Sequence, residues 1–248
     1  MKILLAPAKK MTVNDDDVTT QGLPVCIRQT EVLLGRLRGM SYEELKETWK
    51  CSEKLMRENT ARLERMDLYS RLTPAVYAYV GLAYQHLCAG GMSDEEIGYL
   101  QEHLRILSGF YGILKPLDGV TPYRLEMQAV LPGYGDLYSF WGDRLYQELN
   151  DDVIVDLASK EYSRSIVRYL KDSDRYIEIV FAEYVKGKAV TKGTIAKMAR
   201  GEMVSWMAQN AVTDPEELKR FSRGYAYSEE LSGPSRYVFL AERRQKTE

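Results

Sequence analysis

Charged and aromatic side chains are concentrated in the stretch from His103 to Glu126, which reads HLRILSGFYGILKPLDGVTPYRLE. An arginine beside a carboxylate can bind a phosphate or another anion through two parallel hydrogen bonds. Two neighbouring carboxylates can act as a general acid and a general base. These residue types predict a polar cleft that binds an anion or moves protons. We assign to it the cations Lys9, Arg105 and Arg124, and the residues Asp118, Tyr123, Glu126, Asp156, Ser159 and Glu161.

The same residue types also fit a purely structural role. A buried ion pair, for example between Arg124 and Asp156, would give the same composition without any chemistry. The sequence has no nucleophile–histidine arrangement and no Walker-type phosphate loop. It therefore favours a non-enzymatic protein, with no catalytic residue assigned. An enzyme that acts on a nucleotide or another phosphorylated small molecule is the alternative.

A second group of residues is cationic. The segment from Tyr184 to Gly201 contains five cations and no acidic residue, and Tyr176 and Tyr184 flank it. Positive charge beside aromatic rings suits nucleic acid, because phosphates contact the cations and bases stack on the rings. A solvated hairpin and helix face is the competing interpretation. The DNA- or phosphate-binding residues that we predict are Lys9, Lys10, Arg105, Tyr111, Lys115, Arg124, Lys188, Lys192, Lys197 and Arg200.

Length, charge and composition limit the classes of protein. A chain of 248 residues suits one large domain or two small ones, and the absence of a linker or an internal repeat favours one. The formal net charge is −2, so any nucleic-acid site must be a local basic patch. Two histidines and three scattered cysteines give no metal-ligand spacing, and the cysteines indicate a reducing compartment. No stretch is apolar enough for a signal peptide or a membrane helix. We expect a cytoplasmic monomer without metal, cofactor or membrane partner.

The order of apolar and polar residues predicts a mixed α/β protein with a mixed sheet surrounded by helices. We expect an exposed loop over residues 12–22 and a capping box at Ser41. Ser93 should begin a short helix, and a hairpin turn should lie at 186–188. The expected strands are 2–6, 75–79, 153–157, 176–181, 225–227 and 236–240. The longer helices expected are 25–38, 52–66, 137–149 and 194–211.

The central stretch carries a resemblance to a known family. Its LRILSGFYGILKPLDGVTPYRLEMQ, followed by YSFWG, is similar to the pattern LRxLSGLYGxLxPLDxxxPYRLEMG and YxFWG of the YaaA family of peroxide-stress proteins. Further matches are APAK at residues 6–9, DLASKEY at 156–162 and AKMARG at 196–201. The resemblance spans nearly the whole chain. It implies a single YaaA-like domain over residues 1–248 with an unusual topology.

The resemblance also implies a role and a binding motif. In that family, protection against peroxide is linked to DNA binding and to limiting free intracellular iron. Its members are described as carrying a helix-hairpin-helix, which Ser108–Gly112 would supply here, although two residues separate Gly109 from Gly112 instead of one. The chain departs from the family pattern at Leu82, where the family has an acid. It departs also at His86, Gln128 and Met198.

Overall fold

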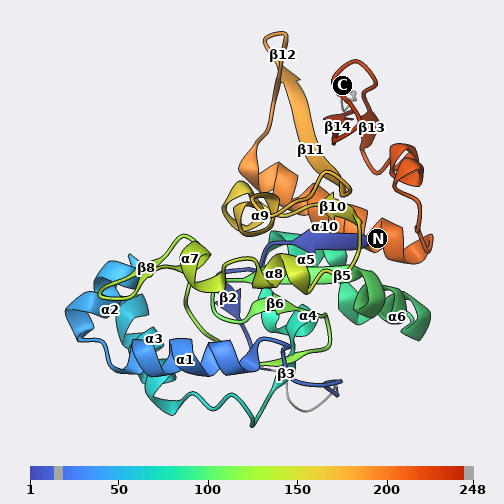
Figure 1. Cartoon of the computed structure of the whole chain (residues 1–248). Helices are drawn as coiled ribbons and strands as arrows, with labels where there is room; N and C mark the ends of the chain where they lie inside the picture. Colours follow the sequence, from blue (N-terminus) through green and yellow to red (C-terminus); the bar gives the residue numbers. More distant parts are fainter. Residues whose placement is uncertain (14–18, 243–248) are drawn as a thin grey trace, which may run out of the picture.

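The central strand of the protein is the first one in the chain. In the computed structural model, which describes residues 1–13 and 19–242, β1 (Lys2–Leu5) pairs with β10 on one side and β5 on the other (Figure 1). Ile3, Leu4 and Leu5 are almost completely buried, because helices cover both faces of the sheet here. The middle of the predicted loop 12–22 lies outside the described residues.

The sheet has eight strands in the order β13-β14-β11-β10-β1-β5-β6, with β12 paired to β11. The five inner strands are parallel and the two edges and β12 are antiparallel. Besides β1, the strands of this sheet are β5 (Leu104–Ser108), β6 (Gly112–Leu114), β10 (Val153–Asp156), β11 (Arg175–Val185), β12 (Lys188–Val190), β13 (Tyr225–Tyr227) and β14 (Arg236–Ala241). Three short strand pairs lie outside it: β2 (Lys10–Met11) with β4 (Tyr79–Val80), β3 (Thr73–Pro74) with β7 (Gly119–Val120), and β8 (Val130–Leu131) with β9 (Gly135–Asp136).

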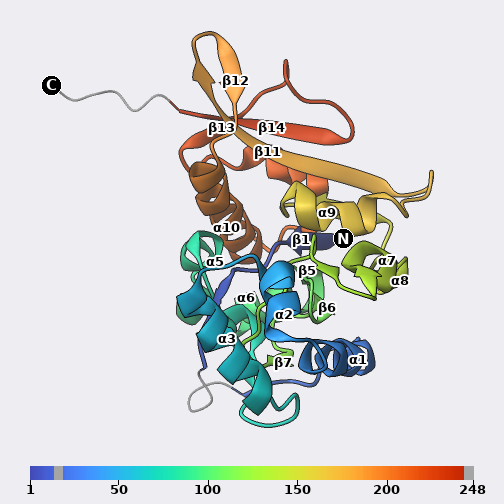
Figure 2. The same ribbon diagram turned by 90° about the vertical axis from the view of Figure 1, so that its left-hand side faces the viewer.

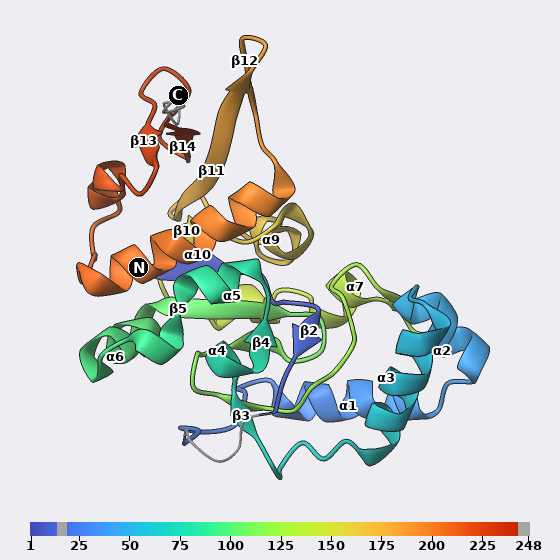
Figure 3. The ribbon, with the colours of Figure 1, turned by 180° about the vertical axis from the view of Figure 1, so that it is seen from behind.

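Helices cover both faces of the sheet. Seen from behind, α5, α6 and α10 lie in front of the strands (Figure 3), whereas α8 and α9 lie on the opposite side. The helices are α1 (Ile27–Arg38), α2 (Tyr42–Trp49), α3 (Glu53–Arg65), α4 (Ala75–Ala78), α5 (Leu82–Leu87), α6 (Asp94–His103), α7 (Leu137–Trp141), α8 (Arg144–Gln147), α9 (Lys160–Val167) and α10 (Gly193–Gln209), with 3-10 turns at Ala89–Gly91 and Pro215–Arg220. No helix among the described residues is both long and apolar enough to cross a membrane.

Close packing joins α10 to α5. A Cβ atom on Gly201 of α10 would lie 1.9 Å from the carbonyl oxygen of Ala83 in α5, so only glycine permits this approach. His86 of α5 adds a 2.7 Å contact between its Nδ1 and the Glu202 carboxylate. The two helices lie side by side in two views at right angles (Figure 2). The position of α10 is thus fixed relative to the start of α5.

The fold class predicted from the sequence is confirmed: the chain is one mixed α/β domain with a mostly parallel mixed sheet flanked by helices. The capping box predicted at Ser41 is present, and Ser93 forms another one at the start of α6. The predicted strands near residues 2, 153, 176, 225 and 236 occur, and so does the hairpin turn at 186–188.

Three local predictions are wrong. Residues 75–78 form the helical turn α4 instead of a strand, and the backbone N–H groups of Ala75 and Val76 donate to the carbonyl groups of Asp118 and Pro116. The helix predicted over 137–149 is broken, because Gly142 takes a φ of +56° between α7 and α8. The Ser108–Gly112 turn joins the antiparallel strands β5 and β6, so it is not a helix-hairpin-helix.

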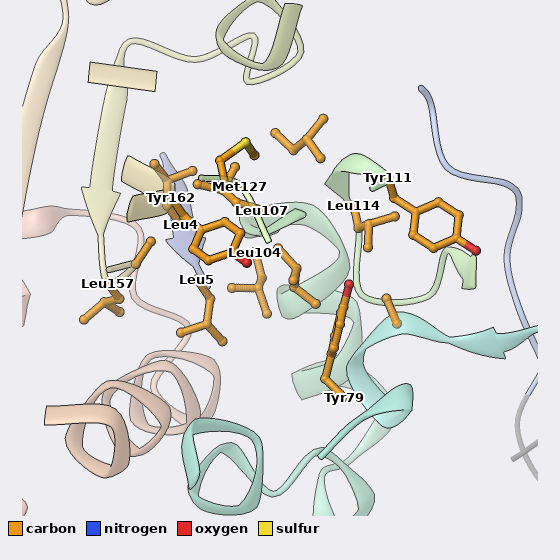
Figure 4. Packing of buried hydrophobic residues seen from close by; sticks show 14 of the residues in the cluster. Leu4, Leu5, Tyr79, Leu104, Leu107, Tyr111, Leu114, Met127, Leu157 and Tyr162 are labelled. Carbon is orange, nitrogen blue, oxygen red and sulfur yellow. The ribbon is translucent and has the colours of Figure 1, made fainter. Parts of the chain in front are cut away.

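The hydrophobic core surrounds the carboxyl end of β1. Figure 4 shows Leu4 and Leu5 beside Tyr162 and Leu157, with Leu104 and Leu107 of β5 next to them (Figure 4). Tyr111, at the β5–β6 turn, is also buried and packs edge-on against Tyr123 at a centroid distance of 5.4 Å. The residues that follow β1 and β10 are therefore anchored on rigid, buried strands.

Candidate nucleic-acid and phosphate site

A cavity of about 410 Å³ opens at the carboxyl ends of β1 and β10. We call it the strand-end cavity. The chain leaves β1 toward β5 and leaves β10 toward β11, so the strand order reverses between these two neighbours. Ligands of open α/β sheets bind in the crevice at such a switch point. The position of the cavity is therefore the one where the topology favours a ligand.

Loops and helix ends from distant parts of the chain form its walls. Residues 5–10 follow β1, residues 80–84 lead into α5, residues 123–126 follow β7, and residues 157–162 include the start of α9. Lys197 and Arg200 reach it from α10. Five cations and two carboxylates line it, which leaves an excess of three positive charges. The cations are Lys9, Lys10, Arg124, Lys197 and Arg200, and the carboxylates are Glu126 and Glu161.

The segment 123–126 is extended, and its side chains alternate between two faces. Tyr123 and Leu125 are buried, whereas Arg124 and Glu126 are half-buried and face the cavity. Gly109 packs closely against this segment. A Cβ atom there would lie 2.6 Å from the carbonyl oxygen of Leu125, so a larger residue would push the segment away. The Tyr123 hydroxyl also forms hydrogen bonds of 2.7 Å with Ser108 and 3.0 Å with Tyr79. The rigid β5–β6 turn thus fixes where Arg124 points.

Glu126 holds two of the cations in place. Its Oε1 lies 2.8 Å from the Lys9 Nζ and 2.7 Å from the Arg124 Nη2. The Nε of Arg124 is buried and has no hydrogen-bond partner among the described residues, and the same is true of the Arg200 Nε. Buried polar groups usually have partners. Each of the two guanidinium groups therefore has one buried donor that no described residue satisfies.

Glu161 is the second carboxylate. Its Oε1 accepts a 3.3 Å hydrogen bond from the backbone N–H of Gln128. Burial raises the pKa of the Glu161 carboxyl, the Gln128 N–H lowers it, and the negative charge of Glu126 raises it again. This carboxyl consequently holds its proton to a higher pH than an exposed glutamate.

A second cavity, of about 690 Å³, adjoins the first at Arg200 and lies between α9 and β11. We call it the helix–strand cavity. It is also lined by five cations and two carboxylates: Lys160, Arg164, Arg168, Arg200 and Arg236, with Asp156 and Glu178. Lys160, Arg164 and Arg168 follow one another at intervals of four on one face of α9. That spacing is visible in the sequence, but the sequence analysis did not assign these residues or Arg236.

Asp156 and Arg200 meet between the two cavities. The buried Asp156 carboxylate accepts hydrogen bonds from the Tyr176 hydroxyl and, at 2.7 Å, from the Ala158 N–H. Burial lowers the pKa of Arg200, and the carboxylates of Asp156 and Glu178 raise it. The guanidinium stays charged at any physiological pH. Asp156 therefore helps to keep a cation at this buried position.

The structure brings together most of the predicted site residues and separates the rest. Nine of them line the strand-end cavity: Lys9, Lys10, Tyr123, Arg124, Glu126, Ser159, Glu161, Lys197 and Arg200. Asp156 lies in the helix–strand cavity instead. Six others lie elsewhere: Arg105, Tyr111, Lys115, Asp118, Lys188 and Lys192.

Arg105 and Asp118 are buried apart from both cavities. The Arg105 guanidinium donates to the carbonyl groups of Leu104 at 2.8 Å and Gln101 at 3.2 Å, whereas Asp118 accepts from the Lys115 N–H at 2.8 Å. The assignment of Arg105 to one cleft with Lys9 and Arg124 is therefore wrong, because β5 directs Arg105 away from the strand-end cavity. The Tyr111 hydroxyl accepts a hydrogen bond from the Thr121 N–H at 3.0 Å and is buried.

The remaining cations lie on other surfaces. Lys115 lines a separate cavity beside α6. Lys188 is exposed on β12 at the projecting hairpin, and Lys192 pairs with Glu183 near the start of α10. Among the described residues, no group of three or more His, Cys, Asp or Glu side chains could hold a metal ion.

Comparison with known proteins identifies the family. A protein from Agathobacter rectalis named "UPF0246 protein" is 52% identical over 96% of this chain and 98% of its own length. Proteins of the same name from Pediococcus pentosaceus and Limosilactobacillus reuteri are 47% and 45% identical, over 97% and 96% of this chain and 98% of each relative. The family described as "Peroxide stress protein YaaA" matches residues 1–231. The chain therefore belongs to the YaaA family of peroxide stress proteins.

Proposed function

We propose that this protein protects the cell during peroxide stress by binding DNA, in the cytoplasm, through the two adjoining cavities. The supporting observation is the local charge. Nine cations and four carboxylates line the two cavities together, in a protein whose formal net charge is −2. Cations concentrated against an otherwise acidic surface attract phosphates and release counterions when DNA binds.

The cations on α9 are available to a ligand. Lys160, Arg164 and Arg168 form no ion pair within the part of the chain that the structure describes, and all three are exposed. Arg164 and Arg168 instead lie over the ring of Tyr138, at 4.8 Å and 5.6 Å from its centroid. Stacking on an aromatic ring orders a guanidinium without neutralising it. These residues are the ones that we expect to contact phosphates.

The test compares two triple variants with the same change in charge. The first is Lys160→Gln with Arg164→Gln and Arg168→Gln. The control is Lys54→Gln with Arg57→Gln and Arg65→Gln, three exposed cations on α3. Binding to a short duplex is measured by fluorescence anisotropy as the salt concentration rises.

We expect the wild-type affinity to fall by about 10²–10³ between about 50 and 200 mM salt, as for roughly five phosphate contacts. The α9 triple variant should lose about three units of the salt slope, and the α3 control should lose none. Equal effects of the two triples, or an affinity that does not change with salt, would refute the proposal.

The proposal extends to iron. Free iron converts peroxide into hydroxyl radicals that damage DNA, and we propose that the protein limits this damage. Cells that lack the protein should accumulate more chelatable iron and more DNA lesions after peroxide treatment. The wild-type chain should restore both, and the α9 triple variant should not restore DNA integrity. Full restoration by that variant would separate the protection from DNA binding.

An enzymatic function is the second candidate, and the size of the strand-end cavity favours it. A volume of about 410 Å³ suits a small molecule, and Glu126 and Glu161 could act as an acid–base pair beside a bound phosphate. Incubation with a panel of nucleotides tests it. Turnover that Glu161→Gln abolishes would support an enzyme, and the absence of turnover would leave binding alone.

A further inference from the structure

The lining of the strand-end cavity is more apolar than phosphate contacts require. Its apolar lining, which we call the floor, includes the half-buried residues Ala6, Pro7, Leu82 and Ala83. The side chains of Leu5, Leu125 and Leu157 and the rings of Tyr84, Tyr123 and Tyr162 are buried directly behind it. A phosphate placed on this floor would lose its hydration without gaining a partner. The cations at the rim and the apolar floor therefore suit two different parts of one ligand.

The dimensions exclude a duplex from the interior. A cavity of about 410 Å³ lies within the range of small-molecule sites, roughly 300–1,000 Å³. Duplex DNA, whose major groove alone is about 12 Å wide, can only lie across the opening. One nucleotide, with a flat base and a charged backbone, matches both the volume and the division into floor and rim.

Polar groups at the base of the rim could bind the edge of a base. Ser159 precedes α9 but its hydroxyl forms no capping hydrogen bond, and the Arg124 Nε has no hydrogen-bond partner among the described residues. Glu161 offers a carboxylate that is held by the backbone N–H of Gln128. Proteins that extract a base bind it in this way, by stacking and by hydrogen bonds to its edge.

We propose that the strand-end cavity takes a single nucleotide that is swung out of a bound DNA strand. The base lies on this floor, against Pro7, Leu82 and Ala83. The phosphates on either side lie on the exposed cations Lys10 and Lys197 at the rim, while the rest of the duplex lies across the opening of the helix–strand cavity. This inference rests on the proposed DNA binding and names the part of DNA that the cavity selects.

Selection follows from the energy of extraction. An unpaired, mismatched or damaged nucleotide leaves the stack more easily than a paired one. The protein should therefore prefer DNA that contains such a nucleotide, although the rim contacts only the backbone. We express this preference as the ratio of the affinities for two duplexes. The general attraction of the cations for DNA cancels in the ratio, so the ratio reports on the cavity alone.

The experiment uses the full chain and two short duplexes, one intact and one with a single bulged 2-aminopurine. We expect the wild type to bind the bulged duplex about tenfold more tightly, and the emission of 2-aminopurine to change by about twofold or more as the base leaves the stack. Ser159→Phe places a ring in the cavity and should abolish both the preference and the change. Ser222→Phe, the same substitution at an exposed position outside both cavities, should retain both.

The outcomes separate this inference from the proposed function. Tight binding of both duplexes by the wild type, with equal affinity and unchanged emission, would overturn nucleotide insertion and leave DNA binding intact. Binding of free deoxyadenosine monophosphate without binding of either duplex would overturn both and favour the enzymatic candidate. The wild-type measurements decide these cases even if Ser159→Phe fails to fold.

Discussion

Arg124 belongs to an ion pair of the site and also lines the strand-end cavity. One of its terminal nitrogens pairs with Glu126 at 2.7 Å, its Nε is buried without a hydrogen-bond partner in the described residues, and its side chain is only 13% exposed. Lysine cannot reproduce the planar fork of donors that an arginine offers. Arg124 is consequently the residue at which a structural role and a binding role can be separated most sharply.

Arg124→Lys should weaken DNA binding more than it weakens the fold. The lysine can keep one contact with Glu126, so the free energy of unfolding should fall by less than about 1 kcal/mol. The affinity for a short duplex should fall by about fivefold to tenfold, because the second donor direction is lost. Urea unfolding and anisotropy measure the two quantities. A lowered unfolding midpoint with unchanged DNA affinity would make Arg124 a structural residue.

Asp118 predicts a pH dependence of stability. Burial raises the pKa of its carboxyl to about 6, although the N–H of Lys115 and the charges of Lys115 and Arg105 lower it. The folded state therefore binds the proton more tightly than the unfolded chain, in which an aspartate has a pKa of about 3.9. The contribution of Asp118 to the free energy of unfolding is therefore fully present below about pH 4, and it is lost as the pH rises through about 6.

Asp118→Asn removes this ionisation and keeps an oxygen that can accept from the Lys115 N–H. The stability of the wild type relative to the variant should therefore fall by about 1–3 kcal/mol between about pH 4 and pH 7. Urea unfolding at a series of pH values measures the difference. Profiles that stay parallel over this range would show that Asp118 is not the group responsible.

At the scale of elements, the contact between α10 and α5 sets the position of Lys197 and Arg200. A methyl group at Gly201 would collide with the Ala83 carbonyl, and neither helix backbone can yield without moving. Gly201→Ala should therefore lower the free energy of unfolding by about 1–3 kcal/mol, as overpacking does. It should also weaken DNA binding by displacing the cations on α10.

Gly98→Ala is the matched control. Gly98 is exposed in α6, and a Cβ atom there would meet nothing within 4 Å. Alanine favours helix, so this variant should be about 0.5–1 kcal/mol more stable than the wild type. Thermal unfolding of both variants checks the pair. A neutral Gly201→Ala would mean that α5 and α10 can separate without loss.

Local signals predicted the elements well where the determinant lies within a few residues. Ser41 and Ser93 each form a capping box with a glutamate three residues later, so a short window contains all the information. Residues 75–78 are aromatic and β-branched and were predicted as a strand. Their helical turn depends on hydrogen bonds to Pro116 and Asp118, some forty residues away. Such tertiary contacts override local propensity.

The candidate site was predictable in its residue types and only partly in its grouping. Lys9, Glu161 and Arg200 converge because β1 lies beside β10. The order of strands in a sheet cannot be predicted from a local sequence pattern. Arg105 was grouped with them because it belongs to the same central stretch, but its strand directs it elsewhere. The spacing of Lys160, Arg164 and Arg168 is visible in the sequence. That these residues line a cavity follows only from the position of α9 in the fold.

At the scale of the molecule, the sheet predicts one cooperative unfolding transition. Neither half of the chain contains a complete sheet, because β1 pairs with β5 from the first half and β10 from the second. Unfolding followed by tryptophan fluorescence should therefore coincide with unfolding followed by circular dichroism. Trp49, Trp141 and Trp206 report on three separate helices. Two transitions, or two stable fragments after limited proteolysis, would contradict a single domain.

The central position of β1 has a consequence for the folding of the protein during its synthesis. Its hydrogen-bonding neighbours lie about 100 and about 150 residues further along the chain. A ribosome therefore releases an apolar strand long before either partner exists, and closing such large loops makes folding slow. Until β10 emerges, this strand is exposed to association with other nascent chains. The early binding of a chaperone to residues 1–13 is therefore an expected step of its synthesis.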